Sequence, residues 1–83
     1  MIYQYYIFEV RQSHAGEYEH DVHWAYDTDP DMARLKAESQ YHTILAAAAL
    51  SNTAMHSASL LAADGRVLLN QFYNHAPSAG DDE

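Results

Sequence analysis

Residues 29–50, DPDMARLKAESQYHTILAAAAL, make up the one stretch that is long and periodic enough to predict a substantial helix. Asp29 can accept hydrogen bonds from the free amides at the helix start, and Pro30 suits the first helical position because no N–H is needed there. Small and apolar side chains share one stripe of this helix, namely Ala33, Ala37, Tyr41, Ile44, Leu45 and Ala48. This stripe is expected to pack closely against a sheet.

Two strands are predicted before the helix. Residues 2–10 are rich in aromatic and β-branched residues and contain no Gly or Pro, which indicates a strand that is apolar on both faces and central in its sheet. Residues 17–27 alternate in polarity, as a half-buried strand does. One face carries Tyr18, His20, Val22, Trp24 and Tyr26, and the other carries Glu19, Asp21, His23, Ala25 and Asp27. The two strands are expected to form an antiparallel hairpin.

Two further strands are predicted after the helix, at residues 54–63 and 66–74. Between them, an Asp-Gly pair is a strong hairpin signal, since Gly accepts the positive φ angle that such a turn requires. A two-residue loop would pair His56 with Tyr73, and a bulged three-residue loop would shift this register. The predicted fold is therefore α+β, in the order ββαββ, with one long helix packed on a four-stranded, mostly antiparallel sheet.

The chain of 83 residues is expected to form a single α+β domain at residues 1–75, followed by a disordered acidic tail at residues 76–83. It contains no Cys, and no apolar run is long enough to span a bilayer. Twelve acidic residues against four basic ones give a formal net charge of −8, which would repel nucleic acid and anionic membranes. We therefore expect a cytoplasmic protein that neither binds nucleic acid directly nor enters a membrane.

The sequence contains no motif of a catalytic site. The serines lack the Gly-x-Ser-x-Gly pattern of a nucleophile elbow, and there is no Cys to act as a nucleophile. The three glycines are isolated from one another, so no Gly-rich phosphate-binding loop is predicted. We expect a protein that is not an enzyme and that needs no cofactor.

Six histidines in an acidic chain raise the alternative of a metal or small-ligand site. Imidazole and carboxylate groups suit Zn²⁺, Mn²⁺ or Fe²⁺, and Glu19, Asp21 and His23 share one face of their predicted strand. His20 and His23 point to opposite faces and cannot share an ion. No motif with metal-ligand spacing is present, so a solvated strand face is the preferred interpretation. The candidate ligands are His20, His23, His42, His56 and His75.

An acidic stretch at residues 17–31 contains six acidic residues and no basic one. Its aromatic residues could anchor a partner while its charges steer the approach, which favours docking on a protein with a basic surface. The simpler interpretation is a face that keeps the protein in solution. The predicted partner-binding residues are Glu17, Glu19, Asp21, Trp24, Tyr26, Asp27, Asp29 and Asp31.

The second half of the helix is apolar on every side, from Ile44 to Leu50. Its alanines could simply supply helix propensity. Alternatively, a second copy of the chain covers the excess apolar surface. On that hypothesis the protein is a homodimer with an interface at Ala46, Ala47, Ala49 and Leu50.

Several short segments in the second half of the chain also resemble a known group of proteins. These segments are Tyr41-His42, Ile44–Ala49, Ser51, His56-Ser57, Asp64-Gly65 and Tyr73–His75, followed by the acidic tail. Over residues 38–83 the chain is similar to short accessory open reading frames of bacterial phages and integrative mobile elements, a group without an assigned activity. The resemblance implies a mobile-element accessory protein of the small binding type, which includes inhibitors of host defence systems.

Three functions follow as hypotheses. The first is a small non-enzymatic binding protein that acts by protein–protein interaction. In its most concrete form it is an anti-CRISPR-like nucleic-acid mimic that occupies the basic surface of a host nucleic-acid-handling or defence protein. The second is a protein that binds a metal or small ligand through His and carboxylate groups. The third is a self-assembling structural accessory protein that packs through its Ala-rich helix.

Overall fold

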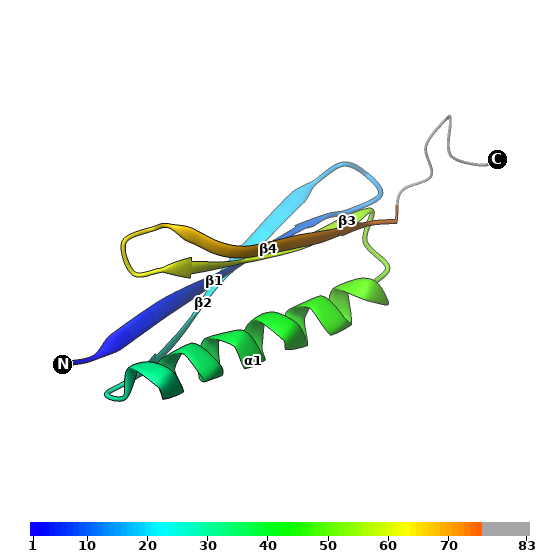
Figure 1. Ribbon diagram of the computed structural model, residues 1–83. Helices are drawn as coiled ribbons and strands as arrows, with labels where there is room; N and C mark the ends of the chain where they lie inside the picture. The colour runs from blue at the N-terminus through cyan, green and yellow to red at the C-terminus, as the bar shows by residue number, and fades with distance from the viewer. Residues whose placement is uncertain (76–83) are drawn as a thin grey trace.

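Four strands and one helix make up residues 1–75, the part of the chain that this computed structural model describes (Figure 1). In chain order they are β1 (Tyr3–Gln12), β2 (Tyr18–Asp27), α1 (Pro30–Ala49), β3 (Met55–Ala62) and β4 (Val67–Asn74). The strands form one sheet in the order β2-β1-β3-β4, and every neighbouring pair is antiparallel. The predicted α+β fold and its ββαββ order are confirmed. The predicted acidic tail at residues 76–83 lies outside the described residues.

The first hairpin pairs β1 with β2 from Tyr3 opposite Asp27 to Gln12 opposite Tyr18. Gly16 takes a φ of 94° in the connecting turn and donates its N–H to the carbonyl oxygen of Ser13 at 2.9 Å. The other edge of β1 pairs with β3, so β1 is an inner strand, as its aromatic and β-branched sequence predicts.

The helix begins and ends where its sequence predicts. Asp29 is the N-cap, and its carboxylate accepts a hydrogen bond from the backbone N–H of Asp31 at 3.1 Å, while Pro30 occupies the first turn. At the other end, the N–H of Leu50 donates to the carbonyl oxygen of Ala47 at 3.2 Å. Within residues 1–75, no helix combines the length and the apolar character that crossing a membrane demands.

The second hairpin combines both of the predicted registers. Next to the turn, the N–H of Ala62 donates to the carbonyl oxygen of Arg66 at 2.9 Å, which leaves a three-residue loop with Gly65 at a φ of 94°. A bulge then follows between Leu60 and Leu61, after which His56 lies opposite Tyr73, as a two-residue loop would place it. The bulge therefore compensates for the longer loop.

Strand alternation gives the sheet two faces that differ in their cover. α1 packs on one of them, here called the helix side, and no helix or strand of residues 1–75 covers the opposite one, here called the open face (Figure 1). Within residues 1–75, ten apolar residues are buried, namely Ile7, Ala25, Ala33, Ala37, Tyr41, Ala48, Ala54, Ala58, Leu60 and Ala62. Seven of them are alanines, and only Ile7 and Leu60 are both large and fully buried. The core is therefore thin, and most of it lies where the predicted helix stripe meets the sheet.

Candidate functional site

The open face is aromatic and uncharged. The strand register places 18 side chains on it, which are Gln4, Tyr6, Phe8, Val10 and Gln12 of β1, Tyr18, His20, Val22, Trp24 and Tyr26 of β2, Met55, Ser57, Ser59 and Leu61 of β3, and Val67, Asn70, Phe72 and Asn74 of β4. None of these is Asp, Glu, Lys or Arg. Depletion of charge with enrichment of aromatic residues is typical of the centre of a protein–protein interface.

Contacts between neighbouring strands hold the open-face side chains in place. Trp24 of β2 packs edge to face against Tyr6 of β1, with ring centroids 6.0 Å apart and an interplanar angle of 74°. The ring centroids of Phe8 and His20 lie 5.9 Å apart, with the two rings tilted at 37° to each other. Despite these contacts Trp24 remains 56% exposed, and Phe72 on the far edge is 57% exposed. The face thus presents large, laterally supported rings to its surroundings.

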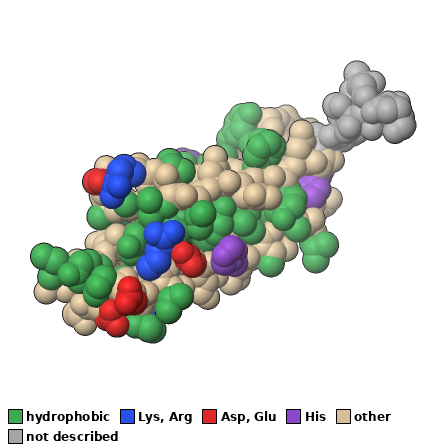
Figure 2. Space-filling view, viewed as in Figure 1, with side chains coloured by type: hydrophobic (Ala, Val, Ile, Leu, Met, Phe, Trp, Pro, Cys, Tyr) green, Lys and Arg blue, Asp and Glu red, His purple; other side chains and the backbone are tan. Residues whose placement is uncertain are grey.

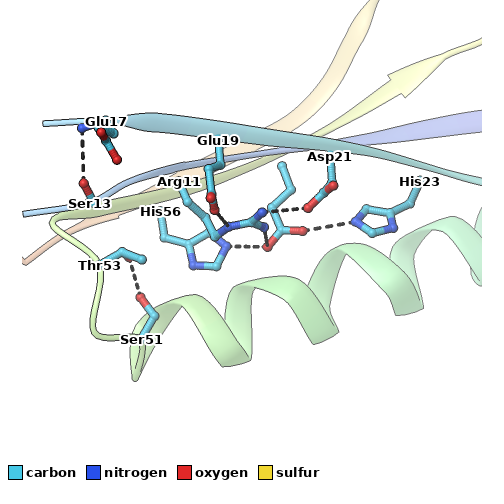
Figure 3. A network of polar contacts seen from close by, with 10 residues as sticks. Arg11, Ser13, Glu17, Glu19, Asp21, His23, Ser51, Thr53 and His56 are labelled. Atoms are coloured by element: carbon cyan, nitrogen blue, oxygen red, sulfur yellow. Dashed lines mark hydrogen bonds and ion pairs between the residues drawn. The ribbon is translucent and has the colours of Figure 1, made fainter.

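All five Asp, Glu and Arg residues of the described strands lie on the helix side, and four of them, Glu9, Arg11, Glu19 and Asp21, form an ionic network (Figure 3). At its centre is Glu9, whose side chain is only 12% exposed. Its carboxylate accepts hydrogen bonds from His56 Nε2 at 2.6 Å and His23 Nε2 at 3.1 Å, and Arg11 lies 3.0 Å away. Arg11 also donates to Asp21 at 2.7 Å. Three strands therefore converge on one buried carboxylate.

The network fixes the ionisation of Glu9. Burial by itself raises the pKa of this carboxyl, but the hydrogen bonds from His23, His56 and Arg11 outweigh burial, so that the pKa of Glu9 lies below its ordinary value of 4.5. The hydrogen bond to Asp21 in turn raises the pKa of the Arg11 guanidinium. Glu9 is thus an anion in the folded protein at neutral pH.

His56 is almost fully buried, and its hydrogen bonding fixes the tautomer. Because the Glu9 carboxylate can only accept, Nε2 of His56 carries a proton. Its Nδ1 is buried and has no hydrogen-bond partner within the described chain.

The five histidines considered as metal ligands lie apart or are already bonded. His20 is on the open face, His42 is exposed on α1, and His75 Nε2 donates to the carbonyl oxygen of Ala48 at 2.9 Å. His23 and His56 each use Nε2 to bond to Glu9. Within residues 1–75, no group of three or more His, Asp or Glu side chains is arranged to hold a metal ion. A shallow hollow of about 230 Å³ beside His23, lined otherwise by Ser39, Gln40, Thr43 and Ile44, is open to solvent.

The predicted partner-binding residues divide between the two faces. Trp24 and Tyr26 are exposed on the open face, whereas Glu19, Asp21 and Asp27 point to the helix side. The remaining three, Glu17, Asp29 and Asp31, are exposed in the segments that flank β2. The structure therefore does not bring these acidic and aromatic side chains together on one surface.

Every basic side chain of the chain is already paired. Besides Arg11 in the Glu9 network, Lys36 lies 2.7 Å from Asp27, Arg34 lies 2.6 Å from Glu38, and Arg66 lies 2.8 Å from Asp64. Blue side chains accordingly lie beside red ones in the space-filling view (Figure 2). The acids left over make the outside of the molecule negative.

The predicted dimer residues form a small surface at the end of α1. Ala46, Ala47 and Leu50 are exposed and Ala49 is partly exposed, while Ala48 between them is buried against the sheet. Three alanines and one leucine offer little apolar area for a second chain.

Sequence analysis missed the roles of Glu9 and Arg11. A signal was present, because positions 9 and 11 of the first strand and 19, 21 and 23 of the second carry complementary charges at alternate positions. In the hairpin these positions share one face, with Glu9 opposite Asp21 and Arg11 opposite Glu19. The hairpin register was needed to place them together.

Comparisons of this chain with protein-family models, with curated proteins and with solved structures give no match.

Proposed function

We propose that this protein acts by binding another protein and not by catalysing a reaction, and that the open face is its binding surface. One observation carries the proposal: the open face combines large exposed aromatic and aliphatic side chains with a complete lack of Asp, Glu, Lys and Arg. The rings are fixed by their neighbours across the strands, so little side-chain freedom is lost when a partner binds.

The same face is unsuited to single-stranded nucleic acid. Proteins that stack bases on sheet aromatics also supply Lys or Arg for the phosphates. The open face has neither, and all four basic residues of the chain are engaged with carboxylates on other surfaces. The proposal is therefore restricted to protein partners.

The test compares variants of matched exposure. Trp24→Ser and Phe72→Ser remove rings from the two edges of the open face, and Leu35→Ser removes an apolar side chain that is 57% exposed on α1. Each tagged variant is incubated with extract of the expressing cells, which also contain an untagged copy of the chain. We expect the wild type and Leu35→Ser to retain a protein that both open-face variants lose. Equal retention by all four proteins would refute the proposal.

A second candidate function is favoured by the pairing of all four basic residues. Because each Lys and Arg side chain is paired with another carboxylate, Glu17, Asp29 and Asp31 present negative charge that could dock on a basic protein. From the sequence resemblance, the partner proposed for this second function is a cytoplasmic host defence protein. Reversing these three charges to Lys should abolish such binding, and the open-face variants should preserve it.

A further inference from the structure

We propose that the open face binds a second copy of this chain, so that two sheets pack face to face in a homodimer. This inference rests on the proposed function, because it names the protein that the same face binds. Core size, charge and area each support it.

The core of one chain is poor in large side chains that are fully buried. Among the described residues only Ile7 and Leu60 are both large and fully buried, and most of the other buried apolar residues are alanines. By contrast, seven large apolar residues are exposed on the open face, namely Phe8, Tyr18, Val22, Trp24, Tyr26, Val67 and Phe72. Small chains without disulfides commonly obtain the missing burial from a second subunit. A second sheet would turn the open face into a second core layer.

The charge distribution allows a second copy to approach the open face and disfavours a basic partner there. With a net charge of −8, two copies repel each other wherever acidic surfaces would meet. The open face avoids this repulsion, because the charged strand residues all point to the helix side. A basic partner, in turn, would find no carboxylate on the open face with which to pair.

The area of the face matches a small but specific interface. Four strands spaced about 4.8 Å apart, with 8 to 10 residues rising about 3.3 Å each, cover roughly 500–600 Å². Two copies would bury about 1,000–1,200 Å² in total, near the lower end of specific interfaces. Small side chains on β3, Ser57 and Ser59, lie between the bulkier residues of β1 and β4. A two-fold axis parallel to the strands would lay β1 of each copy over β3 of the other, which places Phe8 over this shallow strip.

Trp24 provides a direct measurement, since it is the only tryptophan in the chain. We expect wild-type protein to sediment as a dimer at about 100 µM, with Trp24 emission shifted to the blue and shielded from iodide. Dilution to about 0.1 µM should shift the emission to the red, and the urea midpoint should rise with protein concentration. A monomer at the higher concentration, or a dimer whose Trp24 is freely quenched, would overturn the inference.

Charge substitutions locate the interface. Val22→Glu and Phe72→Glu place a carboxylate on β2 and β4 of the open face, whereas Leu35→Glu and Leu50→Glu place one at an exposed position of α1 and at its exposed C-cap. We expect the first two to weaken association at least about tenfold and the other two to leave it unchanged. Dissociation by Leu50→Glu alone would overturn the open-face interface in favour of the helix surface. If the open-face variants do not fold, the wild-type dilution series still decides the question.

Failure of this inference is distinguishable from failure of the proposed function. A wild type that stays monomeric but binds a different protein through Trp24 and Phe72 would overturn the homodimer and leave the proposed function standing.

Discussion

The helix side of the sheet carries all the charged strand residues and a core made mostly of alanine, whereas the open face carries the exposed rings and no charge. On the helix side, Glu9 tolerates burial because His56, His23 and Arg11 satisfy its carboxylate. The rings of the open face keep much of their apolar surface exposed, which contact with another molecule would cover. Polarity alone therefore does not tell which face of the sheet the helix covers. What decides it is whether each side chain finds hydrogen-bond, ion-pair or packing partners on that face.

The largest expected effect separates two adjacent residues of β3 that point to opposite faces. Leu60→Ala empties the centre of the helix-side core and should lower the free energy of unfolding by about 2–5 kcal/mol. Leu61→Ala, on the open face, should cost much less in dilute solution, because Leu61 is only partly buried in one chain. Urea unfolding at low protein concentration measures both, and equal losses would contradict the difference between the faces.

Glu9→Gln tests whether the ionic network supports the helix side. The neutral amide loses the ion pair with Arg11 and the negative charge that strengthens the hydrogen bonds from the histidines, so we expect a loss of about 1–3 kcal/mol in the free energy of unfolding. Glu19→Gln is the matched control, since Glu19 is three-quarters exposed and lies 3.6 Å from the same Arg11. Its loss should be much smaller. A similar loss in both variants would mean that burial of Glu9 contributes nothing.

The same variant should change the pH dependence of stability. A carboxyl whose pKa is lowered by folding contributes stability at pH values above its unfolded pKa, and this contribution disappears as the pH falls through the folded pKa. The pKa of Glu9 is lowered from 4.5, so wild-type stability should fall with decreasing pH below this value. Glu9→Gln should lose that part of the decrease, as measured by thermal unfolding from pH 7 to pH 3. An unchanged profile would argue against the lowered pKa.

Asp29→Ala should destabilise the first turn of α1, the helix that packs on the helix side of the sheet. Loss of the hydrogen bond to the N–H of Asp31 leaves an amide of the first turn unpaired, which typically costs about 1 kcal/mol. Asp31→Ala keeps this bond and removes only a favourable charge near the helix dipole, so it should cost less. Helical circular dichroism during thermal unfolding compares the two. A greater loss for Asp31→Ala would contradict the role of Asp29 as the cap.

Much of the fold could be predicted from local signals. The helix follows from Asp29, Pro30 and the apolar stripe, and the last turn follows from the glycine at position 65. These features act within a few residues of one another, so the sequence displays them directly. The bulge between Leu60 and Leu61 was harder to foresee, because it depends on how the loop and the strand pairing fit together.

The choice of covered face could not be predicted. Alternation in β2 separates Trp24 from Asp21, but it does not say which of them faces α1. Which face the helix covers depends on pairing between strands far apart in the sequence. The pairing of β1 with β3 brings His56 to Glu9, and this hydrogen bond allows charged side chains to lie beside the core. The sequence therefore identified Trp24 and Tyr26 as candidate binding residues. It did not predict the open face as a whole, because it grouped these two residues with acidic residues that lie elsewhere.

The smallest expected effect concerns the helix surface that the sequence favoured for a dimer. Ala46 is exposed and Glu forms helices well, so Ala46→Glu should change stability by no more than about 0.5 kcal/mol. If two copies meet through their open faces, its sedimentation should also equal that of the wild type. Ala48→Glu, two positions along, places the same carboxylate in the buried contact with the sheet and should unfold the chain. If Ala46→Glu is folded and monomeric while the wild type is a dimer, the dimer interface lies on the helix instead. The negative charges of two copies would then lie close to each other in that interface.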